Sequence, residues 1–192
     1  DSCVQCRPGT YGNTKGLEAC VECEAGTYQD APGETACKNC TRGNYCVEGA
    51  SALLTCPAGR RSNPNLRFMT RPEDCVLCSS GSFCPTGSDK ETPCDPGTFA
   101  AENGSSICER CSPGTYQDEP GKTECKPCTP GHYCAEGASA PLPCPAGSRS
   151  NLSLAAMTQL GDCMACEVGT FCETGSASAS PCSPGTFNNA TG

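Results

Sequence analysis

The chain has 192 residues, of which 22 are cysteine and none is tryptophan. Leu, Ile, Val and Phe together make up only about a tenth of it. Such a chain cannot bury one large apolar core, which excludes an ordinary α/β or β-sandwich enzyme. The formal net charge is −8, with 13 basic against 21 acidic residues. This charge argues against nucleic acid or an anionic membrane surface as a partner.

The cysteine content indicates the compartment. Cysteine at this density persists as cystine in an oxidising environment outside the cytosol. No stretch approaches the roughly 18 apolar residues of a membrane span, so we expect no membrane insertion in this segment. The sequence also starts without an initiator Met or the apolar region of a signal peptide. It therefore reads as a mature or excised piece of a longer secreted chain.

The chain is built from tandem repeats. From Cys20 onward, every cysteine recurs 88 positions later, so that Cys20 corresponds to Cys108 and Cys94 to Cys182. The text between the cysteines recurs as well: TYQDAPGETACKNC returns as TYQDEPGKTECKPC. We therefore expect a partial cysteine-rich unit at 1–19, a first block at 20–107 and a second, incomplete block at 108–192.

The smallest repeating unit begins with C-x-x-G followed, two residues after the glycine, by an aromatic residue or, in two cases, by Arg61 or Arg149. Eleven cysteines begin this pattern: Cys6, Cys23, Cys40, Cys56, Cys78, Cys94, Cys111, Cys128, Cys144, Cys166 and Cys182. We call them opening cysteines. The glycine permits a tight turn, and the aromatic side chain is expected to pack against a nearby cystine.

The other eleven cysteines, which we call closing cysteines, alternate strictly with the opening ones. This alternation favours a sequential ladder in which each opening cysteine bonds the next closing one. The predicted pairs are Cys6–Cys20, Cys23–Cys37, Cys40–Cys46, Cys56–Cys75, Cys78–Cys84, Cys94–Cys108, Cys111–Cys125, Cys128–Cys134, Cys144–Cys163 and Cys166–Cys172. Cys3 and Cys182 would pair beyond this segment. A crossed pairing, such as Cys46 with Cys75, stays open because connectivity does not follow from sequence alone.

The pattern C-x-x-G-T-[YF], a spacer and then C-x-x-C resembles the ephrin-receptor-like cysteine-rich repeat, which is related in pattern to the modules of tumour-necrosis-factor receptors. CEAGTYQDAPGETACKNC at 23–40 is one of the closest matches. The blocks CTRGNYC and CTPGHYC look like a variant found in long extracellular repeat proteins of protists and some animals. The resemblance implies elongated β-hairpin modules in secreted or ectodomain settings and no particular activity.

The expected fold class is therefore small and disulfide-rich: an elongated tandem array of short β-hairpin modules with little regular secondary structure. We expect two-stranded pieces near each C-x-x-G pattern. A helical turn has room only at 65–69 and 152–159, inside the two longest loops. Stacked units that touch only their neighbours would form a rod.

Catalytic, cofactor and metal sites are not expected. The C-x-x-C pairs have zinc-like spacing, as at Cys20, Cys23, Cys37 and Cys40, but they interlock without grouping into fours. Redox chemistry at such a pair would need a thioredoxin-like βαβ context, which is absent. His132 is the only histidine, and its counterpart 88 residues earlier is Asn44. We interpret it as a tolerated surface residue and predict that the chain is not an enzyme.

N-linked glycans are the modification that the sequence predicts. The acceptor pattern N-x-[ST] occurs at Asn39, Asn103, Asn151 and Asn189. Asn63 is excluded because Pro64 follows it. Asn39 is a poorer acceptor on steric grounds, since cysteines flank it.

The sequence thus favours an extracellular structural or spacer protein: a disulfide-stapled rod in a surface appendage, filament or matrix. Its expected partners are copies of itself or other extracellular structural proteins. A flagellar hair or a similar fibre on a unicellular eukaryote is the most concrete version, and it rests on the resemblance. The alternative is a receptor or adhesin ectodomain that binds a protein ligand. Its best candidate surface is the arginine group Arg60, Arg61, Arg67 and Arg71, which the second block largely lacks.

Overall fold

The computed structural model describes residues 3–192. Regular structure there is limited to two-residue strands, paired consecutively in ten two-stranded sheets, and two 3₁₀ helices, η1 (Pro72–Asp74) and η2 (Leu160–Asp162). The strands are β1 (Thr10–Tyr11), β2 (Val21–Glu22), β3 (Thr27–Tyr28), β4 (Lys38–Asn39), β5 (Asn44–Tyr45), β6 (Leu54–Thr55), β7 (Arg60–Arg61), β8 (Val76–Leu77), β9 (Ser82–Phe83), β10 (Thr92–Pro93), β11 (Thr98–Phe99), β12 (Glu109–Arg110), β13 (Thr115–Tyr116), β14 (Lys126–Pro127), β15 (His132–Tyr133), β16 (Leu142–Pro143), β17 (Ser148–Arg149), β18 (Met164–Ala165), β19 (Thr170–Phe171) and β20 (Ser180–Pro181). The predicted fold class, a small disulfide-rich array of hairpin modules, is confirmed.

Each module runs from one opening cysteine to the residue before the next. In the Cys23 module, a turn leads through Gly26 into β3, and the chain returns as β4. The amide of the next opening cysteine, Cys40, then donates to the carbonyl of Gly26 at 2.9 Å. The same arrangement recurs along the chain, because the C-x-x-G turn and the two-residue strand before the next opening cysteine recur in the sequence.

Ten disulfides close the modules. They follow the sequential arrangement, with partners six, fourteen or nineteen positions apart: Cys6–Cys20, Cys23–Cys37, Cys40–Cys46, Cys56–Cys75, Cys78–Cys84, Cys94–Cys108, Cys111–Cys125, Cys128–Cys134, Cys144–Cys163 and Cys166–Cys172. Most of the buried apolar positions are cysteines. Cystine therefore takes the place that Leu, Ile and Val hold in an ordinary core.

Two of the aromatic residues that follow the C-x-x-G turns pack against disulfide-bonded cysteines. Tyr28 packs against the cluster of Cys40, Cys46 and Ala50, which belongs to the next module. Tyr45 packs in the same way against the disulfide-bonded cysteines of the module that follows it. The expected contact between aromatic ring and cystine is thus made across the junction between modules, and it helps to hold consecutive modules together.

The sixth residue after an opening cysteine is a second interior position, which the sequence did not reveal. Its buried occupants are Gln29, Cys46, Ser62, Cys84, Ala100, Gln117, Cys134, Ser150 and Cys172. The glycine amide of the preceding module donates to this residue, as from Gly9 to the Gln29 carbonyl at 2.7 Å and from Gly26 to the Cys46 carbonyl at 2.8 Å. Gln29 also donates through Nε2 to the Ala36 carbonyl at 2.7 Å. The position thus couples each module to its neighbour.

Contacts also reach the module after the next. A Cβ added at Gly43 would overlap the carbonyl oxygen of Gly87, two modules further along, and one at Gly131 would overlap that of Gly175. Gly43 and Gly131 have φ of 80° and 82°, a region that L side chains rarely adopt. The expectation that units touch only their neighbours is therefore wrong: C-x-x-G turns such as those at Gly43 and Gly131 pack across a span of three modules.

The long loops contain the helical turns, but not where the sequence placed them. Residues 65–69 and 152–159 form turns and bends without a helix, and the 3₁₀ helices η1 and η2 follow them. The cause is local hydrogen bonding. The carboxylate of Asp74 accepts the amide of Thr70 at 2.7 Å, and Asp162 accepts that of Thr158 at the same distance. The turn therefore forms where an Asp can cap it.

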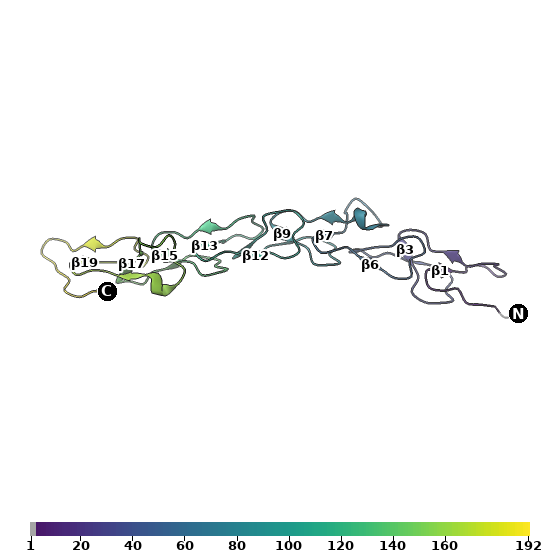
Figure 1. Cartoon of the computed structure of the whole chain (residues 1–192), viewed down its shortest axis with the longest axis horizontal. Coiled ribbons are helices and arrows are strands. Elements are labelled where there is room, and N and C mark those ends of the chain that lie inside the picture. The colour runs from purple at the N-terminus through teal and green to yellow at the C-terminus, as the bar shows by residue number, and fades with distance from the viewer. Residues whose placement is uncertain (1–2) are drawn as a thin grey trace. The chain divides into compact units, whose positions relative to one another are not determined.

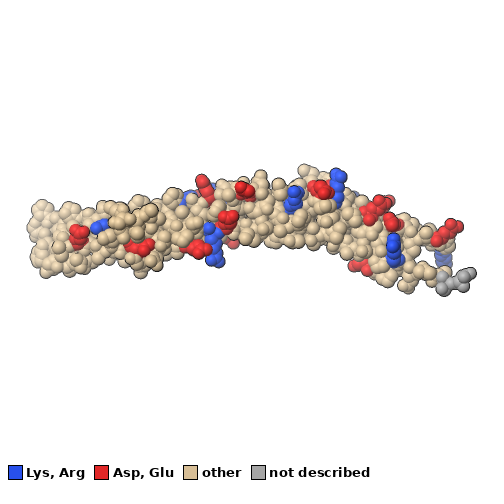
Figure 2. All heavy atoms as spheres, in the orientation of Figure 1, with Lys and Arg blue, Asp and Glu red and all other residues tan. Residues whose placement is uncertain are grey.

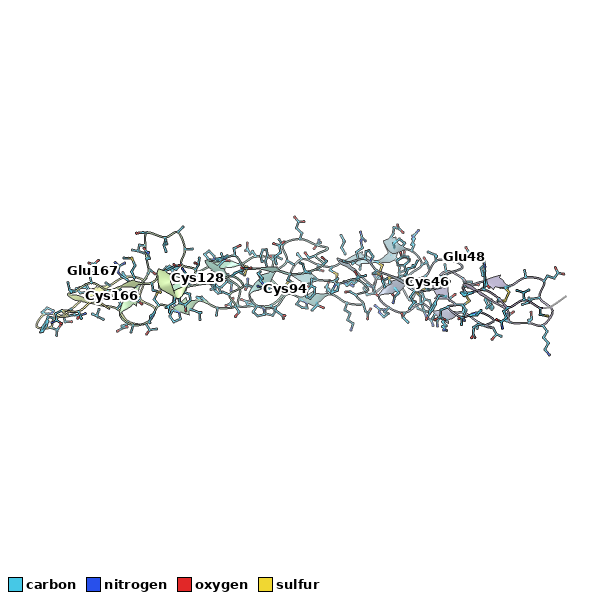
Figure 3. All side chains as sticks on the ribbon, turned by 60° about the horizontal axis from the view of Figure 1, so that its bottom comes forward. Cys46, Glu48, Cys94, Cys128, Cys166 and Glu167 are labelled. Carbon is cyan, nitrogen blue, oxygen red and sulfur yellow. A yellow bond between two sulfur atoms is a disulfide. The ribbon has the colours of Figure 1, made fainter. Side chains whose placement is uncertain are left out.

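The chain divides into two compact units. One comprises residues up to 92 together with 102–107, and the other comprises 93–101 together with 108–192. Within the first unit, β1, β3, β6 and β7 follow one another in chain order (Figure 1). Figure 3 shows Cys46 and Cys166 among the ribbons of their own units, whereas Glu48 and Glu167 lie on the outside, in keeping with their exposure.

Candidate functional site

Each unit contains one loop longer than the others, at 57–74 in the first unit and 145–162 in the second. Each loop is closed by a disulfide between partners nineteen positions apart. We call these segments the first and the second long loop. They are the only stretches of the described chain with helical turns.

The two loops share one backbone frame. Met69 is 4% exposed, and its Sδ accepts the amide of Asn63 at 3.5 Å; Met157 is 6% exposed and accepts the amide of Asn151 at 3.3 Å. Asn63 Oδ1 in turn accepts the amide two residues on at 3.0 Å, and Asn151 makes the equivalent bond at 3.0 Å. These shared bonds set the path of both loops.

The capping carboxylates belong to the same frame. Partial burial opposes ionisation of Asp74, but hydrogen bonds from Thr70 and Arg71 outweigh it and hold the pKa of Asp74 below its ordinary value. The pKa of Asp162 is lowered in the same direction, first by the amide of Thr158. Both carboxylates are therefore ionised at neutral pH and act as acceptors.

The side chains on the frame differ. The first long loop has Arg67 and Phe68 where the second has Ala155 and Ala156. In the first loop these residues line a hollow of only about 10 Å³ against the preceding module. In the second loop the equivalent hollow measures about 190 Å³. Replacing a guanidinium and a phenyl ring by two methyl groups thus leaves an open recess.

The open recess is mixed in polarity. Its wall includes Leu154, Ala156 and Met157 on the apolar side and Asn151 and His132 on the polar side. Leu152, at its rim, is 75% exposed. His132 lies on β15, where its Nδ1 is 3.1 Å from the Pro130 carbonyl. The sequence placed this histidine at the surface and did not connect it to a recess.

The arginine group of the first long loop is largely engaged within the unit. Arg60 donates to the Cys75 carbonyl at 2.7 Å. Arg61 pairs with Glu91 at 3.2 Å, and Arg71 pairs with Asp74 at 3.3 Å. The Arg67 guanidinium lies 5.1 Å from the ring centre of Phe68.

Carboxylates balance the cations elsewhere in the first unit too. The pKa of Asp89 is lowered mainly by its hydrogen bond to Arg42. The pKa of Glu91 is lowered first by the amide of Ser79 and then by Arg61. On the face drawn in Figure 2, basic and acidic side chains are interspersed on a mostly uncharged surface. This distribution does not favour a highly charged ligand.

The four predicted acceptor asparagines lie in different settings. Asn39 is exposed on β4 between two disulfide-bonded cysteines. Asn103 is exposed, but its Oδ1 accepts the amide of Ser80 at 2.7 Å. Asn189 is exposed near the end of the described chain. Asn151 alone among the four lines the recess.

Within residues 3–192, no group of three or more His, Cys, Asp or Glu side chains converges as a metal site requires. None of the helices described is long and apolar enough to cross a bilayer.

Sequential disulfides, two-stranded hairpins and a nearly absent apolar core define a tandem cysteine-rich repeat protein. Residues 9–53 and 97–141 each match the family model of tyrosine-protein kinase ephrin type A/B receptor-like repeats. These two stretches are thus ephrin-receptor-like cysteine-rich repeats, and the resemblance seen in the sequence is confirmed there. No curated protein matches the chain significantly. The family is a receptor-like repeat rather than an enzyme class, and together with the disulfides it indicates an extracellular disulfide-rich domain.

Proposed function

We propose that the chain is a structural segment of an extracellular rod and serves as a spacer in a surface appendage, filament or matrix. The observation that carries this proposal is the recurrence of one junction within each unit. In both units, opening-cysteine amides bond the glycine carbonyl of the preceding module, as from Cys40 to Gly26 and from Cys128 to Gly114, both at 2.9 Å. A junction that repeats unchanged can be extended by adding modules.

The mechanism is mechanical. A disulfide every few residues confines a chain that has too little apolar surface to fold by burial alone. Where a turn glycine also packs against the module after the next, as Gly43 does against Gly87, the contact adds resistance to bending. Duplication at 88 residues then sets length and spacing, and copies of the chain or other extracellular structural proteins are the expected partners. A flagellar hair is the most concrete version of such a fibre.

A receptor or adhesin ectodomain is the second candidate, and the receptor-like description of the matched family favours it. The two candidates differ in what the modules do. A spacer uses them all alike, whereas an ectodomain binds a ligand through one or two modules that differ from the rest. The long loops are the modules that differ here.

Small-angle X-ray scattering on the disulfide-intact chain tests the rod. A compact globule of this length has a radius of gyration of about 16 Å. We expect a value more than twice as large and a constant cross-section along the particle. A radius near that of the globule would overturn the proposal. Electron microscopy of native material then separates periodic fibres from isolated ectodomains.

A further inference from the structure

The second long loop combines an open recess with a modification signal on its own wall. Asn151, Leu152 and Ser153 form an N-x-S acceptor, and Asn151 lines the recess. In the first long loop, Pro64 removes the acceptor at the equivalent Asn63. The recess is thus open where the chain has an acceptor and nearly closed where it has none.

We propose that Asn151 carries an N-linked glycan whose first sugar sits in the recess beside Leu154, Ala156 and Met157. The sugar there takes the place that Arg67 and Phe68 cover in the first long loop. This inference rests on the extracellular location in the proposed function, because glycan transfer takes place along the secretory route.

The acceptor is in a suitable local geometry. Oδ1 of Asn151 is held by the amide of Ser153 at 3.0 Å, while none of the hydrogen bonds among the described residues uses its Nδ2. Transfer forms a bond between Nδ2 and C1 of a lipid-diphosphate-linked sugar donor. The bond from C1 to the diphosphate oxygen breaks, and one Nδ2 proton leaves with it. The acceptor nitrogen is therefore available without breaking a contact of the fold.

The recess suits a sugar ring better than it suits water alone. At about 190 Å³ it exceeds the volume of several waters, each of which occupies about 30 Å³. One face of an N-acetylglucosamine ring presents C–H groups, which match Leu154 and Ala156. Its hydroxyls and acetamide lie at the rim, where Thr129 and His132 offer polar atoms. Covering the 75% exposed Leu152 also removes an apolar surface from water.

The other acceptors lack this seat. Asn39, Asn103 and Asn189 are exposed, and none of them lines the recess. A sugar on any of the three would project into solvent. The structure therefore distinguishes Asn151 from the other three acceptors, whereas the sequence pattern treats them alike.

The test is to secrete the full chain from a eukaryotic cell, measure glycan occupancy at each asparagine by peptide mass spectrometry, and record nuclear Overhauser contacts from the first sugar. We expect most molecules to carry a glycan at Asn151, with contacts between its acetyl methyl group and His132 or Leu154. The variant S153A should lose the glycan, yet it keeps the backbone amide that holds Asn151. The double variant A155R/A156F should keep the glycan but lose those contacts, because the side chains refill the recess.

A reciprocal variant supplies the matched control. P64L/N65S creates an acceptor at Asn63, where Arg67 and Phe68 remain, so a glycan there should show no sugar contacts to Asn44. An occupied Asn151 without sugar contacts, or an unoccupied one in a secreted, disulfide-bonded chain, overturns the inference and leaves the rod intact. If the secreted chain is neither folded nor disulfide-bonded, the extracellular location in the proposed function is overturned. The glycan inference then fails with it.

Discussion

The two long loops are the same backbone with different side chains. Both are closed by a disulfide between partners nineteen positions apart, both use a buried methionine sulfur and a capping aspartate, and both end in a 3₁₀ helix. One covers its hollow with Arg67 and Phe68, while the other leaves it open beside Ala155 and Ala156. Cross-links and a few backbone hydrogen bonds therefore fix the path of the loop, which leaves its surface side chains free to vary.

Removing the closing disulfide should have the largest effect, and it should be equal in the two loops. The pairs C56S/C75S and C144S/C163S each lose about 3 kcal/mol of unfolding free energy in the chain-entropy model, because the closed loops have the same length. Denaturant unfolding followed by tyrosine fluorescence measures both losses. If the two losses differ by more than about 1 kcal/mol, side-chain packing contributes more than the shared disulfide and backbone bonds to the stability of one loop.

The pairing itself can be checked on the unmodified chain. Proteolysis without reduction should release peptides that join Cys56 to Cys75 and Cys144 to Cys163. A peptide joining Cys46 to Cys75 would show the crossed arrangement, and the shared frame of the two loops would then be lost as an explanation.

Substituting the turn glycines in the modules that precede the long loops should cause the next loss of stability. G43A and G131A each place a Cβ against a glycine carbonyl two modules away, in addition to the cost of a positive φ. The φ alone costs about 1–2 kcal/mol, so we expect a total loss above about 2 kcal/mol at both sites. Amide exchange measured by NMR across the three modules gives the local values.

Gly16 and Gly169 are the matched controls, because both have positive φ and neither has a neighbour within 4 Å of an added Cβ. Alanine at these two positions should cost only the conformational part. If G131A loses no more unfolding free energy than G169A, the contact between Gly131 and Gly175 does not contribute to stability.

Truncating the buried methionine should lower the unfolding free energy by different amounts in the two loops. Met69 packs with Cys56, Cys75 and Tyr45 in a cluster beside the nearly closed hollow. Met157 lines the open recess, where water already reaches its surroundings. We expect M69A to cost about 3 kcal/mol and M157A about 2 kcal/mol, within the range for a buried methionine. Equal costs would indicate that the recess is not open in solution.

The spacing of the cysteines was sufficient to predict the fold. Alternating opening and closing cysteines, with a C-x-x-G turn after each opening one, predict hairpin modules because the turn reverses the chain and the disulfide then holds its two ends together. The positions of the helical turns were missed, because they depend on a hydrogen bond from Thr70 to Asp74 rather than on apolar periodicity. Composition alone does not show which carboxylate caps which amide.

The module contacts were harder to predict. The buried sixth position holds Gln29 in one module and Ser62 in another, so no residue type marks it. A signal for the three-module contact did exist: glycines such as Gly87 and Gly175 follow closing cysteines at the same spacing as the turn glycines. The sequence also shows that Ala155 and Ala156 replace Arg67 and Phe68 in the second block. Only the structure shows that these two residues cover a hollow.

Acid should weaken both long loops by a small amount and in the same direction. The pKa values of Asp74 and Asp162 are lowered in the folded chain, so their stabilisation is complete above the unfolded value of about 3.9 and is lost as pH falls through the folded value. The chemical shift and exchange of the Thr70 and Thr158 amides report this loss, and D74N and D162N should abolish its pH dependence. Added salt should weaken the effect more at Asp74, because Arg71 stands where the second loop has Gln159. Loss of amide protection that begins well above pH 4 would instead indicate that other carboxylates hold the loops.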